Sequence, residues 1–527
     1  MCPTVAQSRP DSAEFDSINV NVMPIVLLPG VMGTRIQLGG PHWDPDSPTE
    51  LGKMVFLRQR SLANLLDSRK KGVVFNSFAA GPAQEIESNP ALVDRAQFLT
   101  GKRTADSAIF YGTQRGWGGV AWNFYGEFLM KLEERFIALG NYPVYAIGYD
   151  WRQSCRVSGG AVLQRLRAIL QQEGATKALI VTHSMGGLVL RAALQQGATP
   201  LVQGVVHCVM PALGAVVAYR RFHTGATDLL DGQDPTGAAT VTSFVAARIL
   251  DRILGLTPLE YTLTQAYLPG PVELLPTDDY PDIFIRFPLD GAPPPALVLE
   301  ANTAAPNSLV SPPMADIYSL YLQAQQPGIL PSAGDTDPPT VIPVMVGPTP
   351  VLVSLPGETI TSADVSSLSN NIVNARAFQA SVRNLVHPKS AFLVGDIINT
   401  DTQVDFTRSG GGPAGTRISP PRGPDGAGGA SSTDPNDPAS SEGAGAGPPS
   451  SKITVTASMA VRRPAGDGTV PFSSARFASA GGSNIFRRSF PVKHADCFKD
   501  PGFRKEVKQQ LLKFAGLPPD QPDKDDL

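Results

Sequence analysis

Cysteine and histidine are both scarce in this 527-residue chain, which contains four cysteines and six histidines. The cysteines show neither CxxC spacing nor the density of a disulfide scaffold, so we expect them to be reduced thiols. The net charge of −3, without a cluster of lysine or arginine, argues against a nucleic-acid partner. No apolar run approaches the roughly 18–20 residues that a membrane-spanning helix requires, so the sequence predicts no transmembrane segment.

The amino terminus also lacks an export signal. Residues 1–20 contain neither the basic n-region nor the apolar h-region of a signal peptide, and they predict a flexible segment of a protein that is cytoplasmic as synthesised. Export by a specialised secretion machine stays open as a hypothesis. The chain has no Walker A motif, no HExxH motif and no dinucleotide fingerprint after a strand, so we expect no cofactor and no metal.

The most informative stretch is KALIVTHSMGGLVLRAALQQG, residues 177–197. Its apolar start predicts a buried strand, and the spacing of the later leucines predicts a helix that ends near Gly197. Ser184 would then lie on a tight strand-to-helix turn, with its hydroxyl above the sheet and close to the free N–H groups of the helix. This pattern is typical of the nucleophile elbow of α/β-hydrolases, although Thr182 replaces the usual first glycine. An ordinary turn that contains a serine is the alternative.

The order of the predicted elements indicates the fold class. Strands and helices alternate before and after the elbow, which predicts an α/β-hydrolase fold with a mostly parallel sheet and helices on both faces. The expected elements are strands near 24–29, 144–147, 178–181, 205–209, 341–346, 453–461 and 485–492, and helices at 121–139, 161–172 and 501–515.

Several segments interrupt this alternation within a hydrolase domain at 21–515. We expect an insertion at 37–116, a cap or lid at 212–338 with a helix near 243–254, a disordered Gly/Pro/Ser loop at 409–451, and a polar tail at 516–527. Apolar residues in the first insertion, Trp43 and Phe56, are candidates for contact with a membrane or an acyl chain.

A serine nucleophile needs a histidine base and a carboxylate, which in this fold follow the serine in the order acid, then histidine. His494 lies just after a predicted strand and before the last helix, and we favour it over His387, which has no such setting. Asp467 lies in a glycine-flanked turn before His494, and we favour it over Asp396, which also ends an apolar run. Near the start of the chain, the turn after the first strand offers the amide of Val31 to an oxyanion.

Six stretches together carry a family resemblance: LPGVMG (28–33), RGWGGVAWNFYGEFLMKLE (115–133), YDWR (149–152), THSMGG (182–187), ELLP (273–276) and GDGTVP (466–471). With His494 after them, the chain resembles the lecithin:cholesterol acyltransferase-like family, including lysosomal phospholipase A2 and bacterial members. The resemblance implies the triad Ser184, Asp467 and His494, with oxyanion amides from Val31 and Met185. Asp150 and Arg152, within YDWR, are expected to form an ion pair that supports the structure.

These features predict a serine esterase or lipase that acts on lipid acyl esters through an acyl-serine intermediate, as a phospholipase or an acyltransferase. The expected partners are a lipid or acyl-ester substrate and, transiently, a membrane surface; the sequence does not indicate the oligomeric state. Two alternatives remain open. One is a catalytically inactive hydrolase fold that serves as a binding module, and the other is an esterase of small soluble esters.

Overall fold

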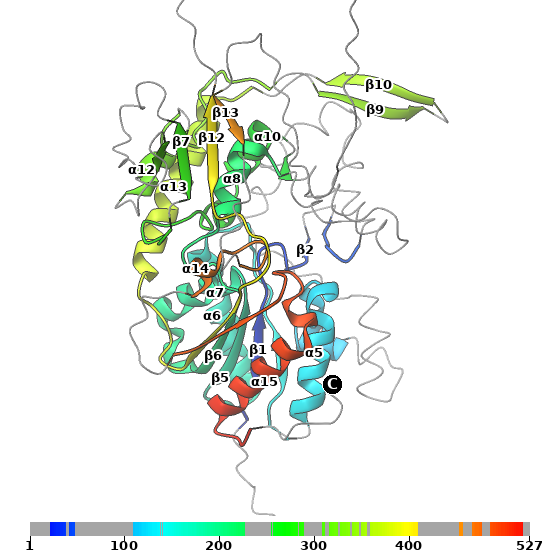
Figure 1. The fold of residues 1–527 in the computed structure, drawn as a ribbon. Helices are drawn as coiled ribbons and strands as arrows, with labels where there is room; N and C mark the ends of the chain where they lie inside the picture. The colour runs from blue at the N-terminus through cyan, green and yellow to red at the C-terminus, as the bar shows by residue number, and fades with distance from the viewer. Residues whose placement is uncertain are drawn as a thin grey trace, which may run out of the picture.

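The structure is a computed structural model, shown as a ribbon in Figure 1. It describes residues 22–37, 42–47, 109–226, 254–288, 308–310, 316–408, 453–456, 466–476 and 485–519, with short gaps at 138, 140, 256, 283, 325–326, 338–339, 347–348 and 356–358. The predicted flexible terminus at 1–20, the loop at 409–451, most of the insertion at 37–116 and almost all of the helix near 243–254 lie outside these residues.

Six parallel strands form the central sheet, in the order β14-β11-β6-β5-β1-β4. They are β1 (Ile25–Leu28), β4 (Val144–Ala146), β5 (Ala178–His183), β6 (Val202–Cys208), β11 (Ser390–Gly395) and β14 (Phe486–Phe490). The predicted parallel sheet is confirmed. Because the strands all run the same way, the loops that follow them meet at one edge, the carboxyl edge.

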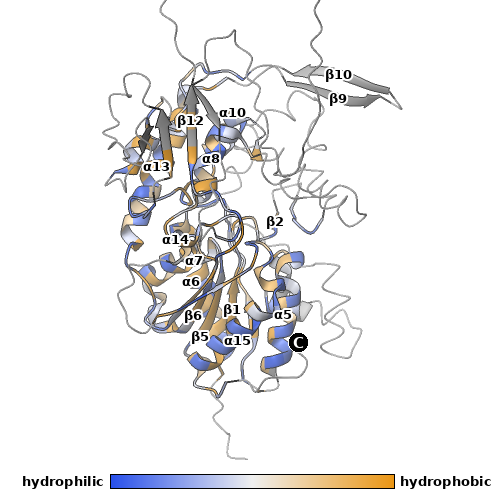
Figure 2. Cartoon of the chain, viewed as in Figure 1, coloured by the Kyte–Doolittle hydropathy of each residue, from blue (hydrophilic) through white to orange (hydrophobic). Residues whose placement is uncertain are grey.

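Helices cover both faces of this sheet, because alternate strand residues point to opposite sides. Leu179 and Val181 of β5 pack in the cluster that contains α5 (Trp122–Ile137) and α15 (Pro501–Ala515). Ile180, between them, packs in the cluster on the other face. That cluster includes residues of α6 (Cys155–Gln172), α7 (Gly186–Ala193) and α13 (Ser362–Val382). In Figure 2 the central strands are orange, whereas α15 shows both colours, as expected of buried strands and an amphipathic helix.

Local sequence signals set the ends of these helices. Asp500 accepts a hydrogen bond of 2.7 Å from the N–H of Phe503 at the start of α15, and Gly516 ends the helix with a φ of 74°. Helix α6 begins at Cys155, earlier than the predicted start at 161, because the Ser154 side chain caps its first turn. The helix contains Gly159, and close packing requires a glycine at that position. A Cβ atom on Gly159 would lie 2.7 Å from the Cβ of Ala192 in α7.

A second sheet, in the order β13-β12-β7-β8, forms part of a cap. Its strands are β7 (Ile285–Pro288), β8 (Ser308–Val310), β12 (Val404–Arg408) and β13 (Ile453–Thr456). The cap helices are α8 (Val216–Thr224), α10 (Pro258–Gln265), α11 (Pro269–Val272) and α12 (Ile317–Tyr321). Figure 1 shows this sheet with α8 and α10 above the central sheet. The cap is built from two excursions of the chain, one between β6 and β11 and one between β11 and β14, and the sequence predicted only the first.

Two predicted strands belong elsewhere. Residues 341–346 were expected to resume the central sheet, but β9 (Thr340–Val346) pairs antiparallel with β10 (Thr349–Leu355) in a sheet of its own. The Gly-Pro pair between the two apolar runs favours such a hairpin. The strand expected at 453–461 is described as β13 and lies in the cap sheet. An apolar run predicts a strand but not the sheet that it joins.

The remaining described strands and α-helices are short: β2 (Ile36–Gln37), β3 (His42–Trp43) and α14 (Phe472–Arg476). Within the described residues, no helix is both long enough and apolar enough to cross a bilayer.

Candidate active site

Ser184 lies at the turn between β5 and α7, at the carboxyl edge of the central sheet. Its φ of 50° is in the left-handed region, which costs a non-glycine residue free energy and is typical of functional turns. Two glycines permit the turn. A Cβ atom on Gly186 would lie 2.4 Å from the carbonyl oxygen of Pro29. A Cβ atom on Gly187 would lie 2.2 Å from the sulfur of Met210, so a larger residue there would have to displace that buried side chain.

Threonine at the first elbow position is accommodated by the neighbouring strand. Thr182 is paired in register with His207 of β6. Its hydroxyl lies 3.0 Å from the Nδ1 atom of His207, and both residues are buried. The hydroxyl group of the threonine is therefore hydrogen-bonded although it is buried in the core.

His494 connects the serine to a carboxylate. Its Nε2 atom lies 2.8 Å from the Oγ of Ser184, and its Nδ1 atom lies 2.7 Å from an oxygen of Asp467. The Asp467 side chain is 1% exposed and that of His494 is 12% exposed, so the pair is largely shielded from water. The structure thus brings together in one hydrogen-bonded chain the three residues that the sequence predicted as a triad.

Asp467 reaches this position through the turn at 466–471. One of its carboxylate oxygens accepts hydrogen bonds from the N–H groups of Thr469 (2.9 Å) and Val470 (2.7 Å), which leaves the other oxygen for His494. Room for the aspartate comes from Gly395 at the end of β11, where a Cβ atom would lie 2.4 Å from the Asp467 Cβ.

The two rival residues lie differently. His387 precedes β11, at the amino edge of the sheet, whereas the elbow lies at the carboxyl edge. Asp396 directly follows β11, but no hydrogen bond or ion pair joins it to His494 within the described part of the chain. The distinction between Asp396 and Asp467 depends on a turn that returns from the cap, which strand order alone does not predict.

The predicted oxyanion amides flank the serine on two loops. Met185 follows it directly and is buried, and Val31 lies in the turn after β1. The N–H of the preceding residue, Gly30, is already engaged, because it donates to the Tyr125 hydroxyl at 2.9 Å. Met32, next in the turn, has a φ of 62°, so this loop also holds a strained backbone.

The other predicted site residues are more remote. Trp43 is 1% exposed: its indole packs edge-on to Trp151 and donates to the carbonyl of Met32 at 2.9 Å, so it offers no surface to a membrane. Phe56 lies outside the described residues. Arg152 and Asp150 form a two-armed ion pair in the loop after β4, with both N–O distances at 2.6 Å.

His183, beside the serine, has contacts that sequence reasoning missed. Its Nε2 atom lies 3.0 Å from the backbone carbonyl oxygen of His494. Its Nδ1 atom lies 2.9 Å from the hydroxyl of Tyr125. Burial, and to a smaller extent the neighbouring His494, lowers the pKa of His183 to about 3, so the ring is neutral at ordinary pH. No sequence spacing connects Tyr125 on α5 with this histidine.

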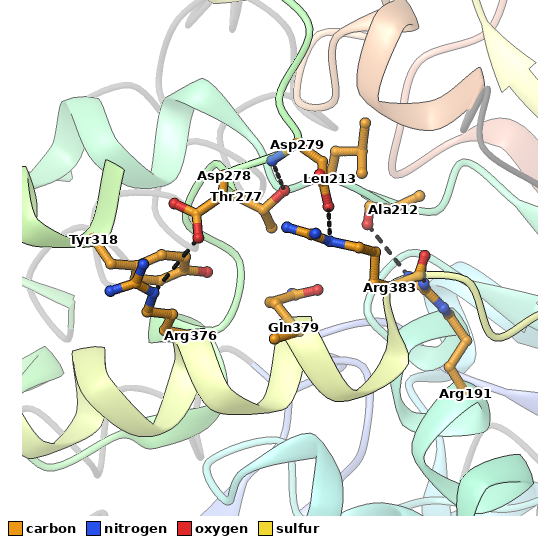
Figure 3. A pocket seen from close by; sticks show the side chains of 11 residues that line it. Arg191, Ala212, Leu213, Thr277, Asp278, Asp279, Tyr318, Arg376, Gln379 and Arg383 are labelled. Carbon is orange, nitrogen blue, oxygen red and sulfur yellow. Dashed lines mark hydrogen bonds and ion pairs between the residues drawn. The ribbon is translucent and has the colours of Figure 1, made fainter. Parts of the chain in front are cut away.

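A separate polar pocket lies where α13 passes the cap (Figure 3). Arg376 of α13 pairs with Asp278 (3.5 Å) and Asp316 (3.0 Å) of the cap. At the end of α13, Arg383 pairs with Asp279 at 2.6 Å. The pocket contains none of the triad residues, and we interpret it as the junction that fastens the cap to the core. Among the described residues no group of histidine, cysteine and carboxylate side chains could hold a metal ion.

The six-stranded parallel sheet, with helices on both faces and the elbow at its carboxyl edge, defines an α/β-hydrolase. Residues 124–273, which include the elbow, match the family described as Lecithin:cholesterol acyltransferase, so the resemblance is confirmed over this part of the chain.

Solved structures and curated proteins give further similarities. The chain is similar in fold to a chain of the Tle4–Tli4 complex, with a TM-score of 0.59 and 17% identity over 95% of this chain and 99% of that one. A phospholipase, PlaB from Legionella pneumophila, is matched over only 28% of this chain and 29% of its own, with 17% identity and a TM-score of 0.18. The uncharacterized protein YJR098C of Saccharomyces cerevisiae is 35% identical over 83 residues, which are 16% of this chain and 12% of the yeast protein.

Proposed function

We propose that this protein is a serine hydrolase that cleaves or transfers acyl groups of lipid esters through an acyl-serine intermediate. The observation that carries the proposal is the pair of hydrogen bonds made by His494, 2.8 Å to the Ser184 hydroxyl and 2.7 Å to the Asp467 carboxylate. A base must reach both the nucleophile and an orienting carboxylate, and His494 reaches both.

In the first half of the reaction, Ser184 Oγ attacks the carbonyl carbon of the ester while His494 Nε2 takes the hydroxyl proton. The protonated His494 then gives this proton to the departing alcohol oxygen, which leaves an acyl group on the serine. Asp467 accepts the Nδ1–H of His494, so it fixes the tautomer that exposes a free Nε2 lone pair to the serine. In the second half, water or an acceptor alcohol attacks the acyl group, and His494 again takes and returns one proton.

Negative charge on the ester oxygen is expected to be met by backbone N–H groups of Val31 and Met185. The turn after β1 and the first turn of α7 lie on either side of Ser184, and donors aimed at the developing charge typically contribute 10²–10³ in kcat. The first turn of a helix also favours negative charge.

The lipid nature of the substrate is supported by the family match over residues 124–273 and by the cap above the carboxyl edge. An acyl chain gains about 0.8 kcal/mol for each methylene that it buries, so a covered apolar trough suits long acyl groups. Hydrolysis and acyl transfer differ only in whether water or an alcohol attacks the acyl-serine.

Labelling with a fluorophosphonate tests the serine mechanism. We expect one mole of probe per mole of wild-type protein and none on Ser184→Ala, with both proteins equally folded by circular dichroism. Labelling that persists in Ser184→Ala would contradict the assignment of the nucleophile. Phospholipid vesicles supplied with and without a long-chain alcohol then separate the two outcomes, since free fatty acid indicates hydrolysis and a new ester indicates transfer.

A further inference from the structure

A buried chain of hydrogen bonds connects the loop after β1 with the loop after β14 underneath Ser184. The N–H of Gly30 donates to the Tyr125 hydroxyl at 2.9 Å, and this hydroxyl lies 2.9 Å from Nδ1 of His183. Nε2 of His183 lies 3.0 Å from the carbonyl oxygen of His494. Tyr125 and His183 themselves are 2% and 6% exposed. We propose that these two side chains are positioning residues that hold the base His494 and the oxyanion loop in register with Ser184, an inference that rests on the proposed function.

The direction of each hydrogen bond follows from the groups at the two ends. The carbonyl of His494 can only accept, so Nε2 of His183 must carry a proton and donate it. In a neutral imidazole Nδ1 is then an acceptor, so the Tyr125 hydroxyl must donate to it. The hydroxyl oxygen is left to accept from Gly30, which it does. Every donor in this chain of hydrogen bonds thus has an acceptor, and the arrangement requires a single tautomer of His183.

This arrangement clamps the backbone of His494 on both sides. Its N–H donates to the carbonyl of Asp467 at 2.8 Å, and its carbonyl accepts from His183. With both neighbouring peptide groups held, the imidazole is directed at Ser184 before substrate arrives. A histidine held only by its Nδ1 contact with Asp467 could swing about that bond.

The same chain of hydrogen bonds also fixes the oxyanion loop, which is the turn after β1 that contains Gly30 and Val31. The N–H of Gly30 is fixed to Tyr125, and the Gly30 carbonyl, which shares a peptide group with the Val31 amide, accepts from the N–H of Gly33 at 3.1 Å. The direction of the Val31 amide is therefore constrained by the peptide groups on both sides of Gly30. The loop also sits directly on the imidazole of His183: a Cβ atom on Gly30 would lie 2.8 Å from Nδ1. A shift of His183 would therefore move the base loop and the oxyanion loop together.

Aromatic packing fixes the imidazole of His183 in place. Tyr125 meets it edge-on with ring centroids 5.6 Å apart, and Phe498 lies at 5.6 Å on another side. Phe498 in turn stacks on Phe128 of α5 at 4.2 Å. Helix α5 and the segment before α15 thus form a rigid wall behind His183, as a positioning group requires.

The test uses the full-length protein with Tyr125→Phe, His183→Leu and His183→Gln, and measures kcat and KM on a short-chain p-nitrophenyl ester. A displacement of about 1 Å can cost about 10²-fold, so we expect kcat to fall 30- to 100-fold in His183→Leu and about tenfold in Tyr125→Phe, with KM within threefold. Glutamine can return a donor near the Nε2 position, so His183→Gln should recover at least a third of the lost rate on a logarithmic scale. The double variant Tyr125→Phe/His183→Leu should lose no more than His183→Leu alone.

Tyr321→Phe is the matched control, because Tyr321 is also a buried tyrosine whose hydroxyl donates a hydrogen bond, here to the backbone carbonyl of Pro276 at 2.8 Å, but it lies in the cap. It should leave kcat unchanged. The inference is overturned if His183→Leu retains wild-type kcat, if the losses appear in KM alone, or if the two single losses multiply in the double variant. If His183→Leu does not fold, Tyr125→Phe and His183→Gln decide by the same kcat criteria. Failure of the proposed function shows differently, as a wild-type protein that neither hydrolyses the ester nor reacts with fluorophosphonate.

Discussion

The backbone of Asp467 pairs with that of Ile398 in a parallel bridge. Ile398 belongs to the loop that follows β11. Asp467 therefore lies at the carboxyl edge of the central sheet, although no strand of that sheet directly precedes it. The preceding strand, β13, belongs to the cap. The carboxylate that contacts the base is therefore delivered by the cap excursion, and its position depends on how that excursion returns to the core.

Replacing Asp467 by asparagine should keep the fold and lower kcat by about 10⁴, because an amide can stabilise the wrong tautomer of His494. Ester hydrolysis under saturating substrate measures this loss. Asp396→Asn serves as the control and should lie within a few-fold of wild type. The opposite ranking of the two variants would give the acid role to Asp396.

Removal of the base should be nearly as damaging as removal of the nucleophile. We expect Ser184→Ala and His494→Ala each to lower kcat by about 10⁶, and the double variant to lose little more, because the residues act as a unit. His387→Ala, at the other edge of the sheet, should retain activity. An inactive but folded His387→Ala protein beside an active His494→Ala protein would show that the base is misassigned.

The contact between Gly395 and Asp467 can be tested with one methyl group. Gly395→Ala introduces a Cβ atom 2.4 Å from that of Asp467, so the acid must move and kcat should fall by about 10²-fold. Gly160→Ala is a suitable control, since the same change in α6 meets only the end of the flexible Gln196 side chain, at 3.1 Å. Alanine there should leave activity unchanged and stabilise the helix by up to about 1 kcal/mol. Equal activities for the two variants would refute the packing argument.

Three buried histidines should make the fold sensitive to acid. Burial lowers the pKa values of His183, His207 and His223 from 6.5 to about 3. As pH falls below 6.5 the unfolded chain takes up these protons and the folded chain does not, so the free energy of unfolding decreases. Below pH 6.5 each group contributes a slope of up to about 1.4 kcal/mol per pH unit, hence about 4 kcal/mol per pH unit together, and this loss is absent above neutral pH.

His223→Phe isolates one of these groups. Its Nε2 atom is buried without a hydrogen-bond partner in the described structure, and its ring packs against Tyr219 and Phe406, so phenylalanine fits the site. Denaturant unfolding between pH 7.5 and 5 should show a slope for the variant that is shallower by about one histidine, up to about 1.4 kcal/mol per pH unit. Equal slopes for the wild type and His223→Phe would contradict the burial argument.

Substrate aggregation offers a test of the lipid proposal. Activity should rise steeply as a long-chain ester or phospholipid passes its aggregation threshold, because a lipase exposes its acyl site to an interface. On sequence grounds, Phe56→Asp should reduce this rise and spare short soluble esters. Smooth saturation without any response to vesicles would instead favour a plain esterase.

Much of the core was predictable because its signals are local. The apolar run and the glycines around Ser184 predict a strand, an elbow and a helix, and Asp500 and Gly516 mark the ends of α15. The strand at 341–346 was correctly predicted as a strand but wrongly assigned to the central sheet, because pairing depends on partners elsewhere in the chain. The second cap excursion was missed for the same reason, since β12 pairs with a strand more than a hundred residues earlier.

The candidate site also contains residues that the sequence predicts and residues whose contacts it does not predict. Ser184, His494 and Asp467 could be proposed from motif, order and elimination, as chemistry restricts each role to a few residue types. The contacts of His183 and Tyr125 could not, because both residues read as ordinary core positions and meet only when α5 packs against β5. Trp43 was a candidate for contact with a membrane or an acyl chain, and its burial in the core excludes only the membrane contact, because a large aromatic side chain also packs well in a core.

The position of β14 at the end of the sheet has a consequence for how the protein loses activity. β14 pairs with β11 alone in the central sheet, and most of its residues are partly or fully exposed. Edge segments with few buried contacts open at a smaller free energy than the whole molecule. His494 is carried just beyond this strand and would leave Ser184 when the edge frays. Mild heating or low denaturant should therefore abolish turnover while the inner strands still protect their amides from hydrogen exchange, so that catalysis reports the integrity of one strand rather than that of the whole fold.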